Sequence, residues 1–185
     1  WNADSTLREC SALHRLFGCG PAKVHREYTS NRWSAYLRPD SSQPFTGLIA
    51  CTTPPVSEHF LEVEALTEKS SQSAESSIME MLHFDLPCVS CDSDHWVNWW
   101  SPPPGKKTNY PALLHHLFQK GHVFYLAFDF FTMAGTEKYP YTNDLFTDLL
   151  LKAQIQPPVR HRTDTPDIIR TAFFETETEY IIHQI

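Results

Sequence analysis

The fold of this chain depends most on residues 109–131, which read NYPALLHHLFQKGHVFYLAFDFF. Asn109 as a cap, Pro111 in the first turn, leucines three or four residues apart and Gly121 as a stop predict a helix over the first half. The run that follows, residues 123–131, is apolar on both faces, as is typical of a strand in the middle of a sheet. We expect this helix and strand to form the centre of the fold.

On either side of this centre, helical and extended patterns alternate along the chain. The patterns predict helices over residues 7–17, 74–82 and 142–150 and from residue 165, and strands over residues 32–37, 45–51, 58–66 and 177–185. For residues 58–66, whose alternation favours a strand, a helix capped by Ser57 is the alternative. The element order is then roughly α-β-β-β-α-α-β-α-α-β. The sequence therefore predicts a mixed α/β fold, with a central mixed β-sheet flanked by helices.

The composition is that of one globular domain over residues 1–185. Of the 185 residues, 41% are hydrophobic and 20% are charged, which is enough apolar material for a sizeable core. The first residue is Trp1 rather than Met, so the chain is compatible with a domain excised from a longer protein. Residues 101–108 contain three consecutive prolines, and we expect them to form a stiff exposed connection.

The net charge bears on whether the chain binds nucleic acid, and the cysteine content bears on its cellular compartment. The formal net charge of −7 argues against nonspecific binding to nucleic acid, because such binding depends on neutralising phosphates with Lys and Arg. Five cysteines are an odd number and no N-x-[ST] sequon occurs, so we expect an intracellular protein rather than a secreted disulfide scaffold. No apolar run reaches the length of a membrane span.

One short segment concentrates possible metal ligands. Cys88 and Cys91 form a C-x2-C turn, the spacing that brings two thiolates to one zinc ion. His95 would supply a third ligand, and His83 or the more distant His59 a fourth. In the alternative interpretation, the cysteines are small apolar core residues and the histidines lie on the surface. A structural zinc at this segment is therefore a hypothesis that depends on the fold.

The same segment resembles a known family of zinc enzymes. Pro87 followed by Cys88 and Cys91 resembles the P-C-x-x-C signature of the zinc-dependent nucleobase deaminases. The resemblance implies that His59 completes the zinc site and that Glu62 transfers protons. His59 and Glu62 are three residues apart here, whereas the family places its His and Glu two apart.

A second resemblance involves carboxylates in the first half of the chain. Asp40 after Pro39, the following apolar run, and Glu62 with Glu64 resemble the layout of the PD-(D/E)xK nucleases. The resemblance implies that these carboxylates hold Mg²⁺ or Mn²⁺ for phosphodiester hydrolysis. Glu64 stands where the family has Lys, so the resemblance implies a nuclease-like domain that is either active or inactive.

Two further features concern single residues of the central stretch. Asp129 lies inside the predicted strand, where it is either a site residue near the end of the sheet or, as we expect, a buried carboxylate with a partner. His115 and His116 lie on the predicted helix, whose apolar face is occupied by leucines, so we expect both side chains on the solvated face.

The tryptophans suggest a binding surface. Trp96, Trp99 and Trp100 lie within five residues of one another, before the proline run, and would form either a packed corner or an interaction hot spot. Because neither enzyme resemblance has its full set of residues, we expect a noncatalytic protein-interaction domain or a subunit of a larger assembly. The metal-dependent nuclease-like domain is the first alternative and the deaminase-like domain the second, so the sequence leaves open whether the chain is an enzyme.

Overall fold

The computed structural model describes residues 11–20, 23–24, 33–42, 44–57, 59–66, 77–88, 103–156 and 171–184. Their elements, in chain order, are α1 (Ser11–Phe17), β1 (Lys23–Val24), β2 (Trp33–Pro39), α2 (Gly47–Cys51), β3 (Pro55–Ser57), β4 (Leu61–Glu62), β5 (Ser77–Pro87), β6 (Pro104–Phe118), β7 (Gly121–Leu126), α3 (Phe130–Thr136), α4 (Pro140–Lys152), β8 (Thr171–Glu175) and β9 (Tyr180–Gln184). The chain divides into two compact units, which we name the sheet unit, Trp1–Leu149, and the hairpin unit, Leu150–Ile185.

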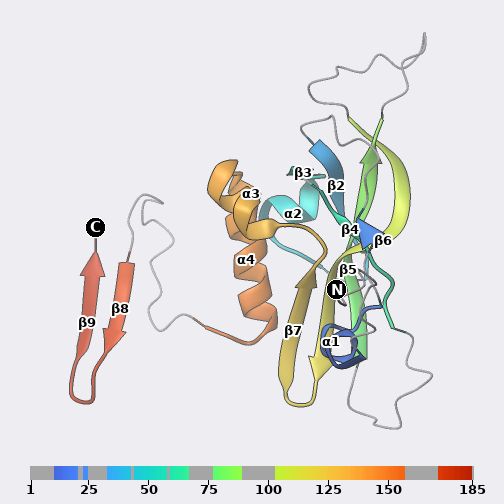
Figure 1. The fold of residues 1–185 in the computed structure, drawn as a ribbon. Helices are drawn as coiled ribbons and strands as arrows, with labels where there is room; N and C mark the ends of the chain where they lie inside the picture. The colour runs from blue at the N-terminus through green and yellow to red at the C-terminus, as the bar shows by residue number, and fades with distance from the viewer. Residues whose placement is uncertain are drawn as a thin grey trace, which may run out of the picture. The chain divides into compact units, whose positions relative to one another are not determined.

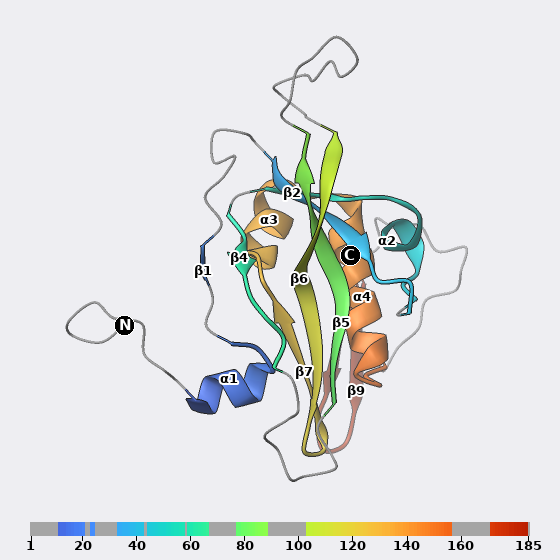
Figure 2. The ribbon, with the colours of Figure 1, turned by 90° about the vertical axis from the view of Figure 1, so that its right-hand side faces the viewer.

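The sheet unit is built on a curled five-stranded sheet of order β3-β2-β5-β6-β7. Helices α2 and α3 and most of α4 lie on one side of this sheet (Figures 1 and 2). The mixed α/β class is thus confirmed. The sheet itself is antiparallel at each of its pairings rather than mixed. At β6 and β7 the reason is local, because a loop as short as Gln119–Lys120 can join only antiparallel strands.

The core of the sheet unit consists of side chains that are almost completely removed from water. Phe84 of β5 packs against Phe60, with ring centroids 4.2 Å apart, and against Phe128 at 6.1 Å. The largest fully buried side chains are Phe60, Phe84, Leu37, Ile49, Met81, Leu82, Leu113, Leu114, Met133, Leu145 and Val56. They come from strands and helices far apart in the sequence, so this core forms only when the sheet and its helices pack together.

The predicted helix over residues 109–118 is wrong, because these residues belong to strand β6. Residues 111–116 are all buried, so both faces of the segment are covered and its periodicity cannot distinguish a helix from a strand. Pro111 has no N–H to donate, and it lies opposite His83 where the register between β5 and β6 shifts. Gly121 begins β7 instead of ending a helix.

The helix predicted over residues 74–82 is also wrong where the structure describes it, since β5 begins at Ser77. Residues 81–87 are all buried, as in a strand covered on both faces. The partner strand β6 begins at Pro104, inside the segment 101–108 for which we expect a stiff exposed connection. Residues 103–107 are exposed.

The predicted strand over residues 45–51 is a short helix, α2. Its first turn is held by two carboxylates of α4. Asp148 Oδ2 accepts from Thr46 N–H at 2.8 Å, and Asp144 Oδ2 accepts from Leu48 N–H at 3.1 Å. These acceptors satisfy N–H groups that the first turn of a helix leaves unpaired. The helix therefore depends on residues nearly a hundred positions away, which local propensity could not reveal.

The predicted strand over residues 123–131 is confirmed only in its first part, as β7 ends at Leu126. Asp129 is exposed and caps α3, where its Oδ1 accepts from Thr132 N–H at 3.1 Å. It is therefore not the buried carboxylate that we expected, because the chain leaves the sheet before reaching it. His115 and His116 are buried on β6 rather than solvated on a helix.

Other expected elements agree with the structure or lie outside it. Helix α1 ends at Phe17 and is followed by Gly18, whose φ of 71° favours glycine. Strand β2 and helix α4 lie where the patterns place them. The strand over residues 58–66 is reduced to the two residues of β4. The predicted terminal strand is present as β9. The helix predicted from residue 165 lies outside the described residues.

Candidate functional site

The structure does not bring His83 to Cys88. His83 lies within β5 and Cys88 follows the end of that strand, so five residues of extended chain, roughly 16 Å, separate them. That span exceeds the reach of two side chains that share one zinc ion. His83 Nε2 instead donates to Glu80 Oε2 at 2.7 Å.

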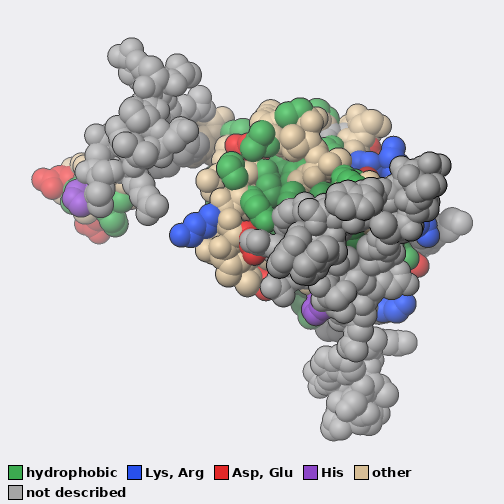
Figure 3. Space-filling view, turned by 90° about the horizontal axis from the view of Figure 1, so that it is seen from above, with side chains coloured by type: hydrophobic (Ala, Val, Ile, Leu, Met, Phe, Trp, Pro, Cys, Tyr) green, Lys and Arg blue, Asp and Glu red, His purple; other side chains and the backbone are tan. Residues whose placement is uncertain are grey.

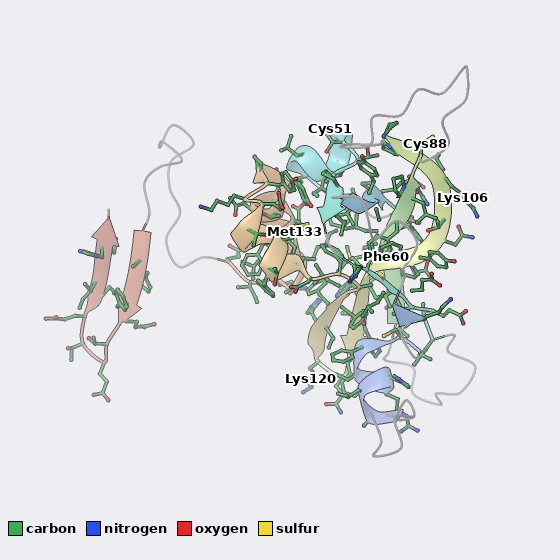
Figure 4. All side chains as sticks on the ribbon, turned by 45° about the horizontal axis from the view of Figure 1, so that its top comes forward. Cys51, Phe60, Cys88, Lys106, Lys120 and Met133 are labelled. Atoms are coloured by element: carbon green, nitrogen blue, oxygen red, sulfur yellow. The ribbon has the colours of Figure 1, made fainter. Side chains whose placement is uncertain are left out.

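The other proposed zinc ligands are only partly described. Cys91 and His95 lie outside the described residues, as do Trp96, Trp99 and Trp100. His59 is exposed, and Figure 4 shows its neighbour Phe60 well away from Cys88. A zinc bound by Cys88, Cys91 and His95 therefore stays a prediction.

The three nuclease-like carboxylates lie in different local settings. Asp40 follows β2 and accepts from Ser42 N–H at 2.8 Å and from Ser42 Oγ at 2.6 Å. Glu62 of β4 lies 3.9 Å from Lys23 Nζ of β1, and Glu64 is exposed. Within the described ranges, no group of three or more His, Cys, Asp or Glu side chains is arranged to hold a metal ion.

A row of polar groups crosses β2, β5 and β6. Arg38 Nε donates to Asp85 Oδ1 at 2.8 Å, and its Nη2 donates to the Thr108 carbonyl at 2.7 Å. The Thr108 hydroxyl in turn donates to the Phe84 carbonyl. The carboxylate of Asp85 is buried, so Arg38 supplies both its counter-charge and a hydrogen bond. This row of hydrogen bonds joins three strands and is a structural element of the sheet.

His83 extends this row toward the end of β2. Its Nδ1 is buried without a hydrogen-bond partner among the described residues, and it lies 4.0 Å from Asp40 Oδ2. The hydrogen bonds from Ser42, with smaller contributions from the charges of His83 and Arg38, hold the pKa of Asp40 below its ordinary value. Asp40 is therefore an ionised acceptor at neutral pH. The hydrogen bond with Glu80 orients the imidazole of His83.

A different kind of surface is found in the hairpin unit. Strands β8 and β9 pair in register from Thr171 opposite Gln184 to Glu175 opposite Tyr180. Because directly opposite residues share a face, one face carries Phe173, Tyr180 and Ile182, and the other carries Phe174 and Ile181. The rings of Phe173 and Tyr180 stack diagonally, with centroids 5.6 Å apart. The hairpin is thus apolar on both faces.

These apolar side chains are open to water. Phe174 is 57% exposed and Tyr180 is 69% exposed, and Ile181 and Ile182 are each about half exposed. Acidic residues surround the turn, where Glu175, Glu177 and Glu179 alternate with threonines. Viewed from above, the small unit at the left of Figure 3 presents hydrophobic and acidic side chains next to each other. Large apolar side chains gathered on a surface mark an interaction site more often than chance exposure.

A smaller aromatic patch lies on the helices of the sheet unit. Phe131 of α3 is 72% exposed and Phe146 of α4 is 44% exposed, and their ring centroids are 6.4 Å apart. Phe130 lies buried beneath them, 5.3 Å from Phe131. This patch has two exposed rings on one face only, so it is less extensive than the apolar surface of the hairpin.

The interpretation of the sequence missed the apolar hairpin as a functional element. The alternation over residues 177–185 predicts an edge strand, but its partner β8 was not recognised. The signal is in the sequence, since AFFE and YIIH flank the four-residue stretch TETE, which suits a tight turn.

The comparisons with known proteins give no assignment: no family model, no curated protein and no solved structure matches the chain. Across the described ranges, no helix is long and apolar enough to cross a membrane. The surface chemistry of the chain is therefore the basis for proposing what it does.

Proposed function

We propose that this chain is a noncatalytic protein-interaction domain or a subunit of a larger intracellular assembly, and that the β8–β9 hairpin is its docking element. The observation that carries the proposal is the exposure of Phe174, Tyr180, Ile181 and Ile182 on the two faces of one hairpin. A strand pair with apolar side chains on both faces suits the interior of a protein rather than its surface.

The stability of a small hairpin supports the same proposal. A two-stranded hairpin is at best marginally stable in water, and a unit shorter than roughly 40 residues rarely forms a sufficient core of its own. Burying each large apolar side chain would stabilise the docked state by roughly 1.5–3 kcal/mol. A partner that covers this hairpin would therefore supply the apolar contacts that the hairpin unit lacks.

The intracellular location is part of this proposal. It is supported by the odd number of cysteines and the missing sequon. Cys19, Cys51 and Cys88, the cysteines that the structure describes, form no disulfide with one another. The tryptophans Trp96, Trp99 and Trp100 stay a second predicted contact, and the metal-dependent alternatives stay predictions that metal analysis of the purified protein would test.

The proposal is tested by site-specific photo-crosslinking in intact cells. A photoreactive phenylalanine analogue would replace Phe174 in one sample and Thr147 in a control, since both side chains are exposed and Thr147 lies on α4. We expect discrete crosslinked products from position 174 and few from position 147. Equal crosslinking at both positions, or none at position 174, would contradict the hairpin as the docking element.

A further inference from the structure

We infer that β9 docks edge to edge with β9 of a second copy of this chain, in an antiparallel pairing centred on Ile182. This inference rests on the proposed function and names the partner of the hairpin. It follows from the direction of the backbone groups, from the charges on the two hairpin edges, and from the sequence of β9, which has no Asp, Glu, Lys or Arg.

The hydrogen-bonding pattern fixes which backbone groups of β9 point outward. The turn closes with Thr176 N–H donating to the Glu179 carbonyl at 2.9 Å. Opposite residues in an antiparallel pair alternate between hydrogen-bonded and non-hydrogen-bonded pairs. Counting from this closing pair, Phe174 with Ile181 is hydrogen-bonded, and Phe173 with Ile182 is not. The N–H and C=O groups of Ile182 therefore point away from β8, as do those of Tyr180 and Gln184.

Within Tyr180–Gln184, the residues of β9 do not protect the outer edge against pairing. Exposed edges are usually blocked by a charged residue, a proline or a bulge. Strand β9 reads YIIHQ and has no Asp, Glu, Lys, Arg or Pro, and its register with β8 is regular. Strand β8 ends in Glu175, whose backbone groups face the other edge. Among the described strands, β9 pairs only with β8, and that pairing leaves the outward N–H and C=O groups of β9 for a further strand.

The sequence of β9 suits pairing with itself. Across a two-fold axis at Ile182, that residue lies opposite its own copy, Ile181 lies opposite His183, and Tyr180 lies opposite Gln184. No two carboxylates are brought opposite each other. The acidic turns, with Glu177 and Glu179, lie at opposite ends of the paired strands and therefore stay apart. Charge repulsion thus favours this antiparallel arrangement over a parallel one, in which the two turns would meet.

The pairing would also stabilise the hairpin, which is only marginally stable as an isolated pair of strands. Three or more strands with a hydrophobic face are needed for independent stability, and two paired hairpins make a sheet of four. Opposite residues share a face, so Phe173, Tyr180 and Ile182 of both copies would form one continuous apolar surface. The second copy therefore extends both the hydrogen bonding and the apolar face.

The first test uses proline to remove a single outward N–H from the full 185-residue chain. Ile182→Pro leaves the bonds inside the hairpin intact, because that N–H points away from β8. Analytical ultracentrifugation over a concentration series would measure the dimer dissociation constant. We expect it to rise at least about tenfold. Thr171→Pro, which removes an outward N–H from the β8 edge, is the matched control and should change it less than about twofold.

A charge-swap test does not depend on how well the hairpin tolerates proline. Ile182→Lys and Ile182→Glu should each weaken self-association, because each places two like charges opposite each other at the two-fold axis. An equimolar mixture of the two variants should restore association, since opposite charges then meet. Restoration in the mixture alone would support a pairing centred on residue 182.

The outcomes separate this inference from the function on which it rests. A chain that stays monomeric at all concentrations, or a dimer that Ile182→Pro leaves unchanged, overturns the pairing with a second copy. If such a chain still gives crosslinks from position 174 to a different protein, the interaction function stands and only its partner changes. If it gives none, both proposals fall.

Discussion

Large apolar side chains of the strands are buried in the sheet unit and exposed in the hairpin unit. In the sheet unit, Phe84 and Leu113 are completely buried because neighbouring strands and the helices beside the sheet cover them. In the hairpin unit, Phe174 and Ile182 are about half exposed on a sheet of only two strands. Similar apolar strand sequences are therefore buried in one unit and exposed in the other. The strands of the sheet unit are covered within that unit, whereas a partner is proposed to cover those of the hairpin unit.

The difference in burial between the two units is tested most strongly by replacing one phenylalanine of each unit with alanine. Phe84→Ala should lower the free energy of unfolding by about 3–5 kcal/mol, because it leaves a cavity among Phe60, Phe128 and their neighbours. Phe174→Ala should change it by less than about 0.5 kcal/mol in the monomer, because that side chain is exposed. Urea denaturation followed by circular dichroism measures both. Equal losses would mean that the hairpin is part of the same core.

The buried Arg38–Asp85 ion pair tests how strongly polar contacts stabilise the sheet unit. Arg38→Ala leaves the buried Asp85 carboxylate without its counter-charge, and should cost about 2–3 kcal/mol, a value reduced because Arg38 is partly exposed. Lys23→Ala, which removes the exposed partner of Glu62, should cost less than about 1 kcal/mol. The same denaturation measurement applies. A loss at Lys23 as large as that at Arg38 would remove the structural role of the polar row.

A third test compares two glycines of the sheet unit. A Cβ at Gly105 would meet the Cys88 backbone at 2.8 Å, near the place where Figure 4 labels Cys88 and Lys106. Gly105→Ala should therefore destabilise by about 1–3 kcal/mol. Gly135 of α3 has open space around it, so Gly135→Ala should stabilise by about 0.4–1 kcal/mol. Thermal unfolding measures both changes, and a stabilising Gly105→Ala would contradict the close approach of Gly105 to Cys88.

The smallest expected effect concerns thiol chemistry. Burial raises the pKa of the Cys19 thiol from 9.0 to about 11, whereas Cys51 is exposed at the end of α2. Alkylation at pH 8 followed by peptide mass spectrometry should modify Cys51 long before Cys19. Because the folded-state pKa is raised, the contribution of Cys19 to stability is present below pH 9 and is lost as the pH rises toward 11. Rapid alkylation of Cys19 in the native chain would contradict its burial.

Local patterns predicted the fold class and several elements, but not the segments that long-range contacts control. The end of α1, the strand β2 and the helix α4 follow from caps, stops and periodicity. A helix was wrongly predicted in place of strand β6 because residues 111–116 are buried on both faces, so helical and strand periods fit them equally well. Helix α2 could not be predicted because Asp144 and Asp148 of α4 hold its first turn.

The candidate site was predictable only in part. The sequence showed that the C-terminal strand alternates, but the exposure of its apolar residues depends on what covers them, and no local pattern contains that information. The expected contribution of His83 to a zinc site fails for a geometric reason, since β5 stays extended between His83 and Cys88. Two ligands five residues apart can share one metal ion only where the chain between them is not extended.

Hydrogen exchange of the full chain, at a concentration where it is monomeric, tests the central claim most directly. The account predicts that the amides of β5 and β6 exchange only through global unfolding, while those of β8 and β9 exchange close to the rates of an unstructured chain. Protection of β8 and β9 equal to that of β5 and β6 in the monomer would contradict it, because the hairpin would then be stabilised by its own chain.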